Sequence, residues 1–116
     1  MTEGVEWLWT LPELADEARS LLRGRVIPEG CTVTVEADVE AGALLFVGRR
    51  LDPPGAALVM LDLDATNEDG ERLALAVREV LGRLDSPLLA PCGPEDVPPL
   101  ELHIQRDGYR VPVRKL

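Results

Sequence analysis

The segment that most restricts the possible folds of this chain is LELHIQRDGYRVPVRK, at residues 100–115. Apolar and polar residues alternate on both sides of the Asp-Gly pair at 107–108, and such a pair between two alternating runs is the strongest short-range sequence signal for a β-hairpin. With this pair as the turn, Ile104 is predicted to face Val111 across the two strands. Pro112 cannot donate an N–H to a neighbouring strand, so the last strand is predicted to lie at an edge of a sheet.

Three further segments, residues 31–39, 43–48 and 56–64, have the composition of β-strands. The first alternates between polar and apolar residues, which indicates that one of its faces is exposed to water. The second and third are apolar at nearly every position, which is typical of strands in the middle of a sheet with both faces covered. Turn-forming residues separate the three segments, so the chain is predicted to run back and forth between neighbouring strands.

Two segments have the residue spacing of amphipathic helices, with apolar residues three and four positions apart. The first, at residues 10–24, begins with a T-x-x-E capping box and ends at a glycine. The second, at residues 67–84, is predicted to expose its outer face to solvent, because acid-first pairs four residues apart stabilise a solvated helix surface. These pairs are Glu68 with Arg72 and Glu79 with Arg83.

The order of these segments predicts an α+β fold with the topology α-β-β-β-α-β-β, in one domain that spans residues 1–116. A two-layer sandwich places the last strand at an edge and gives the apolar strands neighbours on both sides. Its sheet has five strands, is mostly antiparallel and has the strand order 1-2-3-4-5, and both helices lie on one face of it. The third and fourth strands would be the only parallel pair, because the second helix crosses over between them. The strand order 5-4-1-2-3, with the hairpin beside the first strand, ranks second. It would leave the third strand at an edge of the sheet, although this strand is apolar on both faces. A proline-rich loop at residues 85–99 would join the second helix to the hairpin.

The composition excludes several classes of partner. The net charge of -9 and the pI near 4.5 repel phosphate backbones and anionic lipids, so neither nucleic acid nor a membrane is expected as a partner. The chain lacks the apolar stretch of about 18 residues that a membrane span needs, and its first residues do not resemble a secretion signal, so we expect a cytoplasmic protein. Cys31, Cys92 and His103 have no spacing typical of a zinc or redox site, and no cofactor is expected.

Five carboxylates lie within ten positions, from Asp62 to Glu71, where the third predicted strand passes into the second helix. Three of them fall at the start of the helix, where the helix dipole favours negative charge. Asp62 and Asp64 belong to the strand, and two like charges on the same side of an extended chain need a partner. In the predicted topology Arg106 of the hairpin comes close to them, because the ends of the two parallel strands are adjacent.

The stretch VMLDLDAT resembles the first motif of the haloacid dehalogenase-like phosphatases, in which a strand ends in D-x-D-x-T. The resemblance implies a phosphoryl-transfer site with Asp62 as the nucleophile, Asp64 as the acid and base, and a magnesium ion beside them. The family also uses a lysine that is followed by a further acidic pair. In this chain the single lysine, Lys115, comes after the acidic pair at 95–96.

Two functional hypotheses follow from the sequence. One is a small metal-dependent hydrolase, or a protein that binds a small ligand or a cation, because the carboxyl ends of adjacent parallel strands are a common ligand site in α/β sheets. A metal ion would be held by Asp62 and Asp64. The full set of candidate binding residues is Asp62, Asp64, Thr66, Asn67 and Arg106.

The other hypothesis, which we favour, is a non-enzymatic binding or protein-interaction domain. With both helices on one face of the sheet, the other face would present an apolar stripe from the central strands, flanked by polar residues such as Glu101 and His103. The residues predicted to form the stripe are Leu44, Phe46, Leu58 and Met60. Either the proline-rich loop folds over this stripe or a second copy of the chain packs there. The sequence shows no group of residues typical of an active site, and the apolar stripe needs cover. A homodimer is therefore the preferred interpretation.

Overall fold

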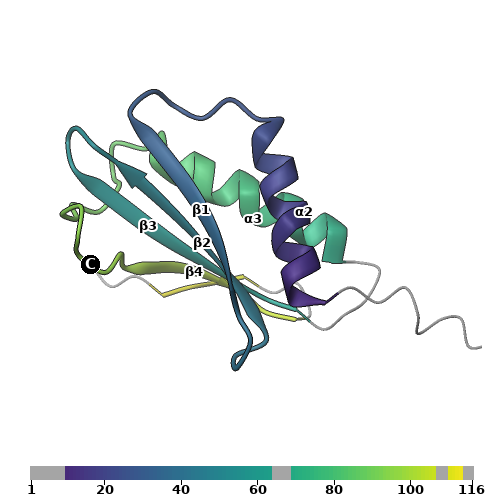
Figure 1. Ribbon diagram of the computed structural model, residues 1–116. Helices are drawn as coiled ribbons and strands as arrows, with labels where there is room; N and C mark the ends of the chain where they lie inside the picture. The colour runs from purple at the N-terminus through teal and green to yellow at the C-terminus, as the bar shows by residue number, and fades with distance from the viewer. Residues whose placement is uncertain (1–9, 64–68, 107–109, 114–116) are drawn as a thin grey trace, which may run out of the picture.

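The computed structural model describes residues 10–63, 69–106 and 110–113, and its elements follow the predicted order α-β-β-β-α-β-β (Figure 1). The helices are α2 (Leu11–Arg23) and α3 (Asp69–Leu84). The strands are β1 (Cys31–Asp38), β2 (Ala43–Arg50), β3 (Gly55–Asp62), β4 (Leu100–Ile104) and β5 (Arg110–Pro112). The predicted α+β fold is therefore confirmed.

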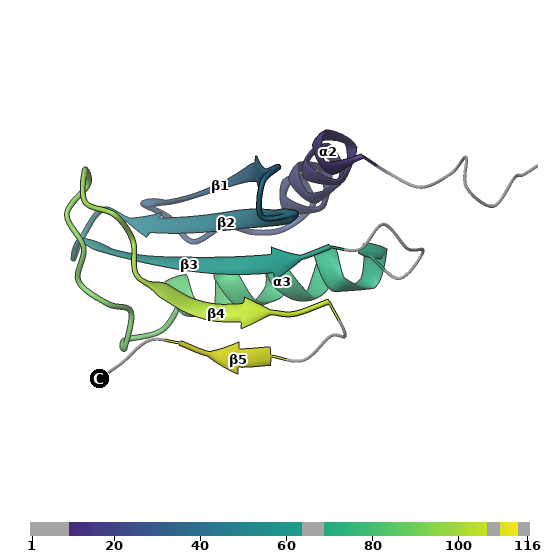
Figure 2. The same cartoon turned by 90° about the horizontal axis from the view of Figure 1, so that it is seen from below.

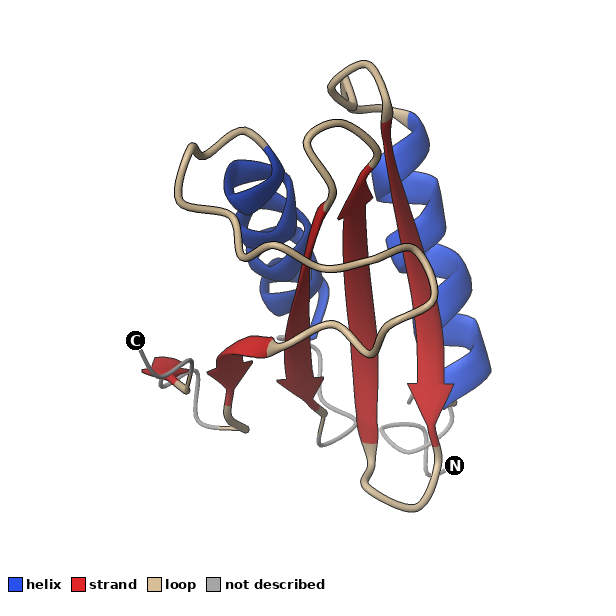
Figure 3. Ribbon diagram, turned by 90° about the vertical axis from the view of Figure 1, so that its left-hand side faces the viewer, coloured by secondary structure: helices blue, strands red, loops and turns tan. Residues whose placement is uncertain are grey.

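The five strands form one sheet in the order β1-β2-β3-β4-β5, as predicted. Neighbouring strands are antiparallel except for β3 and β4, which are parallel and are connected through α3. Figure 2 shows the strands side by side from β1 to β5, and Figure 3 shows that both helices lie on the same face of the sheet. We call this face the helix-covered face and the opposite one the open face.

The core lies between the two helices and the helix-covered face of the sheet. Thr10 caps the N-terminus of α2. Its hydroxyl accepts a hydrogen bond from the Glu13 amide at 3.3 Å, and the Glu13 carboxylate accepts one from the Thr10 amide at 2.8 Å. This is the predicted capping box. The side of α2 that faces the sheet carries the buried residues Leu14, Ala15, Ala18 and Leu22. The buried side chains that the sheet contributes to the main core are Val35, Leu44, Phe46, Val59, Leu61, Leu102 and Ile104. Full burial of each such side chain stabilises the fold by about 1.5 to 3 kcal/mol.

The register of the C-terminal hairpin differs from the prediction by one residue. Ile104 pairs with Arg110 rather than with Val111, and Val111 pairs with His103. Arg110 therefore lies on the helix-covered side of the sheet, where its guanidinium forms an ion pair of 2.6 Å with Glu79 of α3. The predicted register would have turned Arg110 to the open face, away from this carboxylate, so the ion pair favours the register that is observed.

The last strand, β5, lies at the edge of the sheet, as Pro112 predicted. The Val113 amide donates to the Glu101 carbonyl oxygen at 3.3 Å, so Glu101 and Val113 are a hydrogen-bonded pair. Hydrogen-bonded and non-bonded pairs alternate along two antiparallel strands, so the two facing residues next to this pair form no hydrogen bond with each other. These two residues are Leu102 and Pro112, so the missing N–H of the proline removes no hydrogen bond from the sheet. The turn predicted at 107–108 lies outside the described residues.

Candidate functional site

The open face carries a small apolar patch on the two central strands. Leu45 of β2 pairs with Met60 of β3, and Val47 of β2 pairs with Leu58 of β3. All four side chains are partly exposed, in contrast to the fully buried side chains of the helix-covered face. Residues that face each other across two strands have their Cβ atoms about 4.5 to 5.5 Å apart, so the four side chains form one surface. We refer to these four residues as the apolar patch.

Leu44 and Phe46, which the sequence placed in the exposed stripe, are instead buried on the helix-covered face with 0% exposure. Phe46 pairs with Val35 of β1 and with Val59 of β3, and both valines belong to the core under the helices. The placement of these residues was wrong because the run ALLFVG has no polar residue, so no periodicity shows which of its residues share a face. The two residues predicted from β3 do lie on the open face.

The proline-rich loop at residues 85–99 crosses part of the open face (Figure 3). Arg49 lies on this face of β2, and its guanidinium donates hydrogen bonds to the carbonyl oxygens of Gly93 at 3.2 Å and Asp96 at 2.9 Å. A backbone hydrogen bond of 3.1 Å also joins β3 to the loop. The loop is thus bonded to the end of the open face near the β2-β3 turn, and it leaves the end near the β1-β2 turn uncovered.

Asp62 lies on the open face at the end of β3, next to the apolar patch. One of its carboxylate oxygens is 3.0 Å from Nε2 of His103 on β4, and the two side chains are 21% and 24% exposed. The ring N–H is not aligned with this oxygen, so the contact is an ion pair when the imidazole is protonated rather than a formed hydrogen bond. The sequence suggested Arg106 as the partner of Asp62, but Arg106 is exposed and its guanidinium lies against Gly42 in the β1-β2 turn.

Only two of the five candidate ligand residues, Asp62 and Arg106, lie in the part of the chain that the structure describes. The other three, which lie outside it, are Asp64, Thr66 and Asn67. The predicted ligand or metal site therefore stays a prediction.

A buried arginine occupies the carboxyl ends of the two parallel strands. Arg72 of α3 is 8% exposed, and its guanidinium donates hydrogen bonds to the carbonyl oxygens of Asp62, in β3, and of Gln105, just after β4. The sequence predicted that Arg72 lies on the solvated outer face of the helix, and this prediction was wrong. The carbonyl groups at the ends of β3 and β4 need hydrogen-bond donors, and Arg72 lies within reach of two of them. Arg72 therefore supplies hydrogen-bond donors to carbonyl groups at the ends of both parallel strands.

A second group of charged residues links α3 to the hairpin on the helix-covered side. Arg83 is 2.6 Å from Glu79, as predicted, and Glu79 also contacts Arg110 of β5 at 2.6 Å. Arg83 lies 3.7 Å from Glu101 of β4, whose side chain is only 10% exposed. The expectation that Glu101 shares the open face with His103 was therefore wrong, because the register between β3 and β4 shifts at the start of β4 and turns Glu101 towards α3.

No group of three or more His, Cys, Asp or Glu side chains that could hold a metal ion occurs within residues 10–63, 69–106 and 110–113. Neither α2 nor α3 is long and apolar enough to cross a membrane. The chain matches no known family model, and comparison with curated proteins and with solved structures gives no match. A functional proposal therefore has to rest on the geometry of the described residues.

Proposed function

We propose that this chain is a non-enzymatic interaction domain that forms a homodimer through the uncovered part of its open face. The observation that supports the proposal is the apolar patch, in which two adjacent cross-strand pairs of apolar side chains lie on the central strands and none is fully buried. Each CH₂ group that is removed from water contributes about 0.8 kcal/mol, so covering this patch is favourable. A second copy of the chain would supply the cover.

Polar residues flank the apolar patch on both sides, which is the arrangement typical of protein interfaces. Thr34 and Glu36 are exposed on β1, where they pair with two residues of the patch. On the other side, His103 of β4 pairs with Met60. A two-fold axis parallel to the strands would place β1 of one copy over β4 of the other, so that Glu36 of one copy faces His103 of its partner.

The size of the surface predicts a weak dimer. Three strands of eight residues are each about 26 Å long and β4, with five residues, is about 17 Å long. With strands about 4.8 Å apart, the open face of these four strands measures about 460 Å² before the loop covers part of it. Stable complexes bury about 800 Å² on each partner. We therefore expect a dissociation constant in the micromolar range or weaker, and a dimer that is visible only in concentrated solution.

Sedimentation equilibrium over a range of protein concentrations tests the proposal. The wild-type chain should change from monomer to dimer as the concentration rises, whereas Leu45→Glu, which puts a charge at the centre of the patch, should stay monomeric. Val26→Glu is the matched control, because Val26 is 92% exposed in the connection between α2 and β1 and lies on the helix side of the molecule. A wild-type chain that stays monomeric at millimolar concentration contradicts the proposal, and so does a Leu45→Glu variant that dimerises like the wild type.

We also propose that the protein works in the cytoplasm. Cys31 and Cys92 are both free thiols in the structure, which fits a reducing compartment. Mass spectrometry of the protein isolated from its own cells under thiol-blocking conditions tests this assignment. Two blocked thiols are expected, and a disulfide between them would argue for an oxidising compartment.

A further inference from the structure

The two edges of the sheet differ in how far they are open to another strand. At one edge, β5 has three residues and carries Pro112. At the other edge, β1 has eight residues and no proline. A long edge strand presents a row of N–H and C=O groups that can pair with a strand of another molecule. The edge of β1 is therefore the place where association through the sheet would begin.

The hydrogen bonds between β1 and β2 show which groups of β1 point outwards. The Leu51 amide donates to the Gly30 carbonyl oxygen at 3.0 Å, so a hydrogen-bonded pair lies just before β1. Bonded and non-bonded pairs alternate from there, which makes Val35 and Phe46 a non-bonded pair. The N–H and C=O groups of Val35 therefore point away from β2. The same holds for Cys31, Val33 and Ala37.

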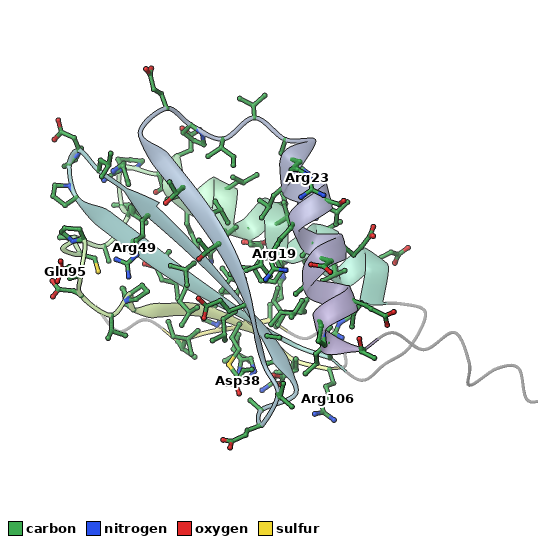
Figure 4. All side chains as sticks on the ribbon, in the orientation of Figure 1. Arg19, Arg23, Asp38, Arg49, Glu95 and Arg106 are labelled. Carbon is green, nitrogen blue, oxygen red and sulfur yellow. The ribbon has the colours of Figure 1, made fainter. Side chains whose placement is uncertain are left out.

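Arg19 of α2 lies on the outer side of β1 at Val35. One terminal nitrogen of its guanidinium donates to the Val35 carbonyl oxygen at 2.6 Å, and the other donates to the Asp16 carboxylate at 2.8 Å. Figure 4 shows the Arg19 side chain on the side of α2 that lies towards β1. Val35 is the fifth of the eight residues of β1, so the guanidinium is held near the middle of the edge.

An incoming strand would compete with the Arg19 guanidinium for the same place. A paired strand runs about 4.8 Å from its neighbour, and it would have to donate a backbone N–H to the outward-pointing Val35 carbonyl oxygen. Nη2 of Arg19 already lies where that donor would be. A hydrogen bond from a charged donor is also stronger than one from a backbone amide. Two copies that paired through the middle of β1 would bring their Arg19 side chains close together, and these like charges would repel each other.

We infer that Arg19 closes the β1 edge to strands from other copies of the chain. It does so by using the carbonyl group with which such a strand would pair, while Asp16 holds the guanidinium in place. The inference does not depend on the proposed dimer, because β1 contributes no residue to the apolar patch. Either proposal can therefore fail while the other holds.

A peptide with the sequence of residues 32–38 is a suitable probe, because it is the strand that a second copy would offer. It is titrated into dilute, isotope-labelled protein, and binding is followed by amide chemical shifts. In Arg19→Ala the peptide should cause saturable shifts at Val33, Val35 and Ala37, whose amides point outwards. It should bind to this variant about ten-fold more tightly than to the wild type, because the Val35 carbonyl group is then free to pair.

Arg23→Ala is the matched control for this experiment. Arg23 lies one turn further along α2, and its guanidinium donates to the Ser20 hydroxyl of the same helix at 2.9 Å, so its removal should leave peptide binding as weak as in the wild type. Equal binding of the peptide to Arg19→Ala and to the wild type would overturn the inference. So would the absence of a saturable shift in Arg19→Ala, or shifts that lie on the apolar patch instead of β1.

Discussion

Two neighbouring residues of β2 show how differently the two faces of the sheet are covered. Phe46 is fully buried under the helices, whereas Leu45, one position earlier, is partly exposed on the open face. On one face, α2 and α3 exclude water from the side chains of the central strands; on the other, a loop covers one end and leaves the other end bare. We therefore expect the stability of the protein to depend mainly on the helix-covered face and its association mainly on the open face.

The largest expected effect is the loss of stability on truncation of Phe46. Phe46→Ala removes a fully buried ring and should lower the free energy of unfolding by about 3 to 5 kcal/mol, measured by urea denaturation. Leu45→Ala should cost less than about 1.5 kcal/mol, because part of this side chain is already in water. Similar losses for the two variants would show that the two faces do not differ in the way described.

The buried arginine behind the ends of β3 and β4 should have the next largest effect. Arg72→Met keeps much of the side-chain volume but leaves two carbonyl oxygens without their donor, so the free energy of unfolding should fall by about 2 to 3 kcal/mol. Arg78→Met is the control on the same helix, and since Arg78 is exposed its effect should stay within about 0.5 kcal/mol. Should both variants unfold at the same urea concentration, Arg72 would have no structural role.

The smallest of these effects is expected on the open face, where Arg49 holds the loop. Arg49→Gln should lower the free energy of unfolding by only about 1 kcal/mol, because its hydrogen bonds join a surface loop to the sheet. The same variant should be cut faster within residues 85–99 by a broad-specificity protease, since a loop without these bonds opens more often. Arg25→Gln, at an exposed position between α2 and β1, serves as the control. Unchanged cleavage of the loop in Arg49→Gln would argue against its anchoring role.

The strand order could be predicted from the sequence because a few local signals exclude the alternatives. Pro112 restricts the last strand to an edge, and the apolar runs of β2 and β3 require neighbours on both sides. One helix between β3 and β4 then requires a parallel pair. Each of these constraints is carried by consecutive residues, so no knowledge of distant contacts is needed to apply it.

The positions of individual side chains were harder to predict, because partners far away in the sequence decide them. Phe46 was assigned to the wrong face because its strand is apolar on both sides. Arg72 fits the pattern of a solvated helix, and nothing near it in the sequence shows that two strand ends lie within its reach. Arg49 binds main-chain carbonyls, which leave no side-chain motif. The one available signal was its spacing, since Arg49 alternates with Leu45 and Val47 along the strand and so shares their face.

The proposed dimer is tested most directly by an isotope-filtered NOE experiment on a concentrated, equal mixture of labelled and unlabelled protein, which detects contacts between copies only. The two-fold arrangement predicts contacts between the Met60 methyl group of one copy and the Leu45 side chain of the other, and these contacts should vanish in Leu45→Glu. Contacts between copies that are confined to another surface, such as the edge of β1, would contradict the proposal, as would their complete absence.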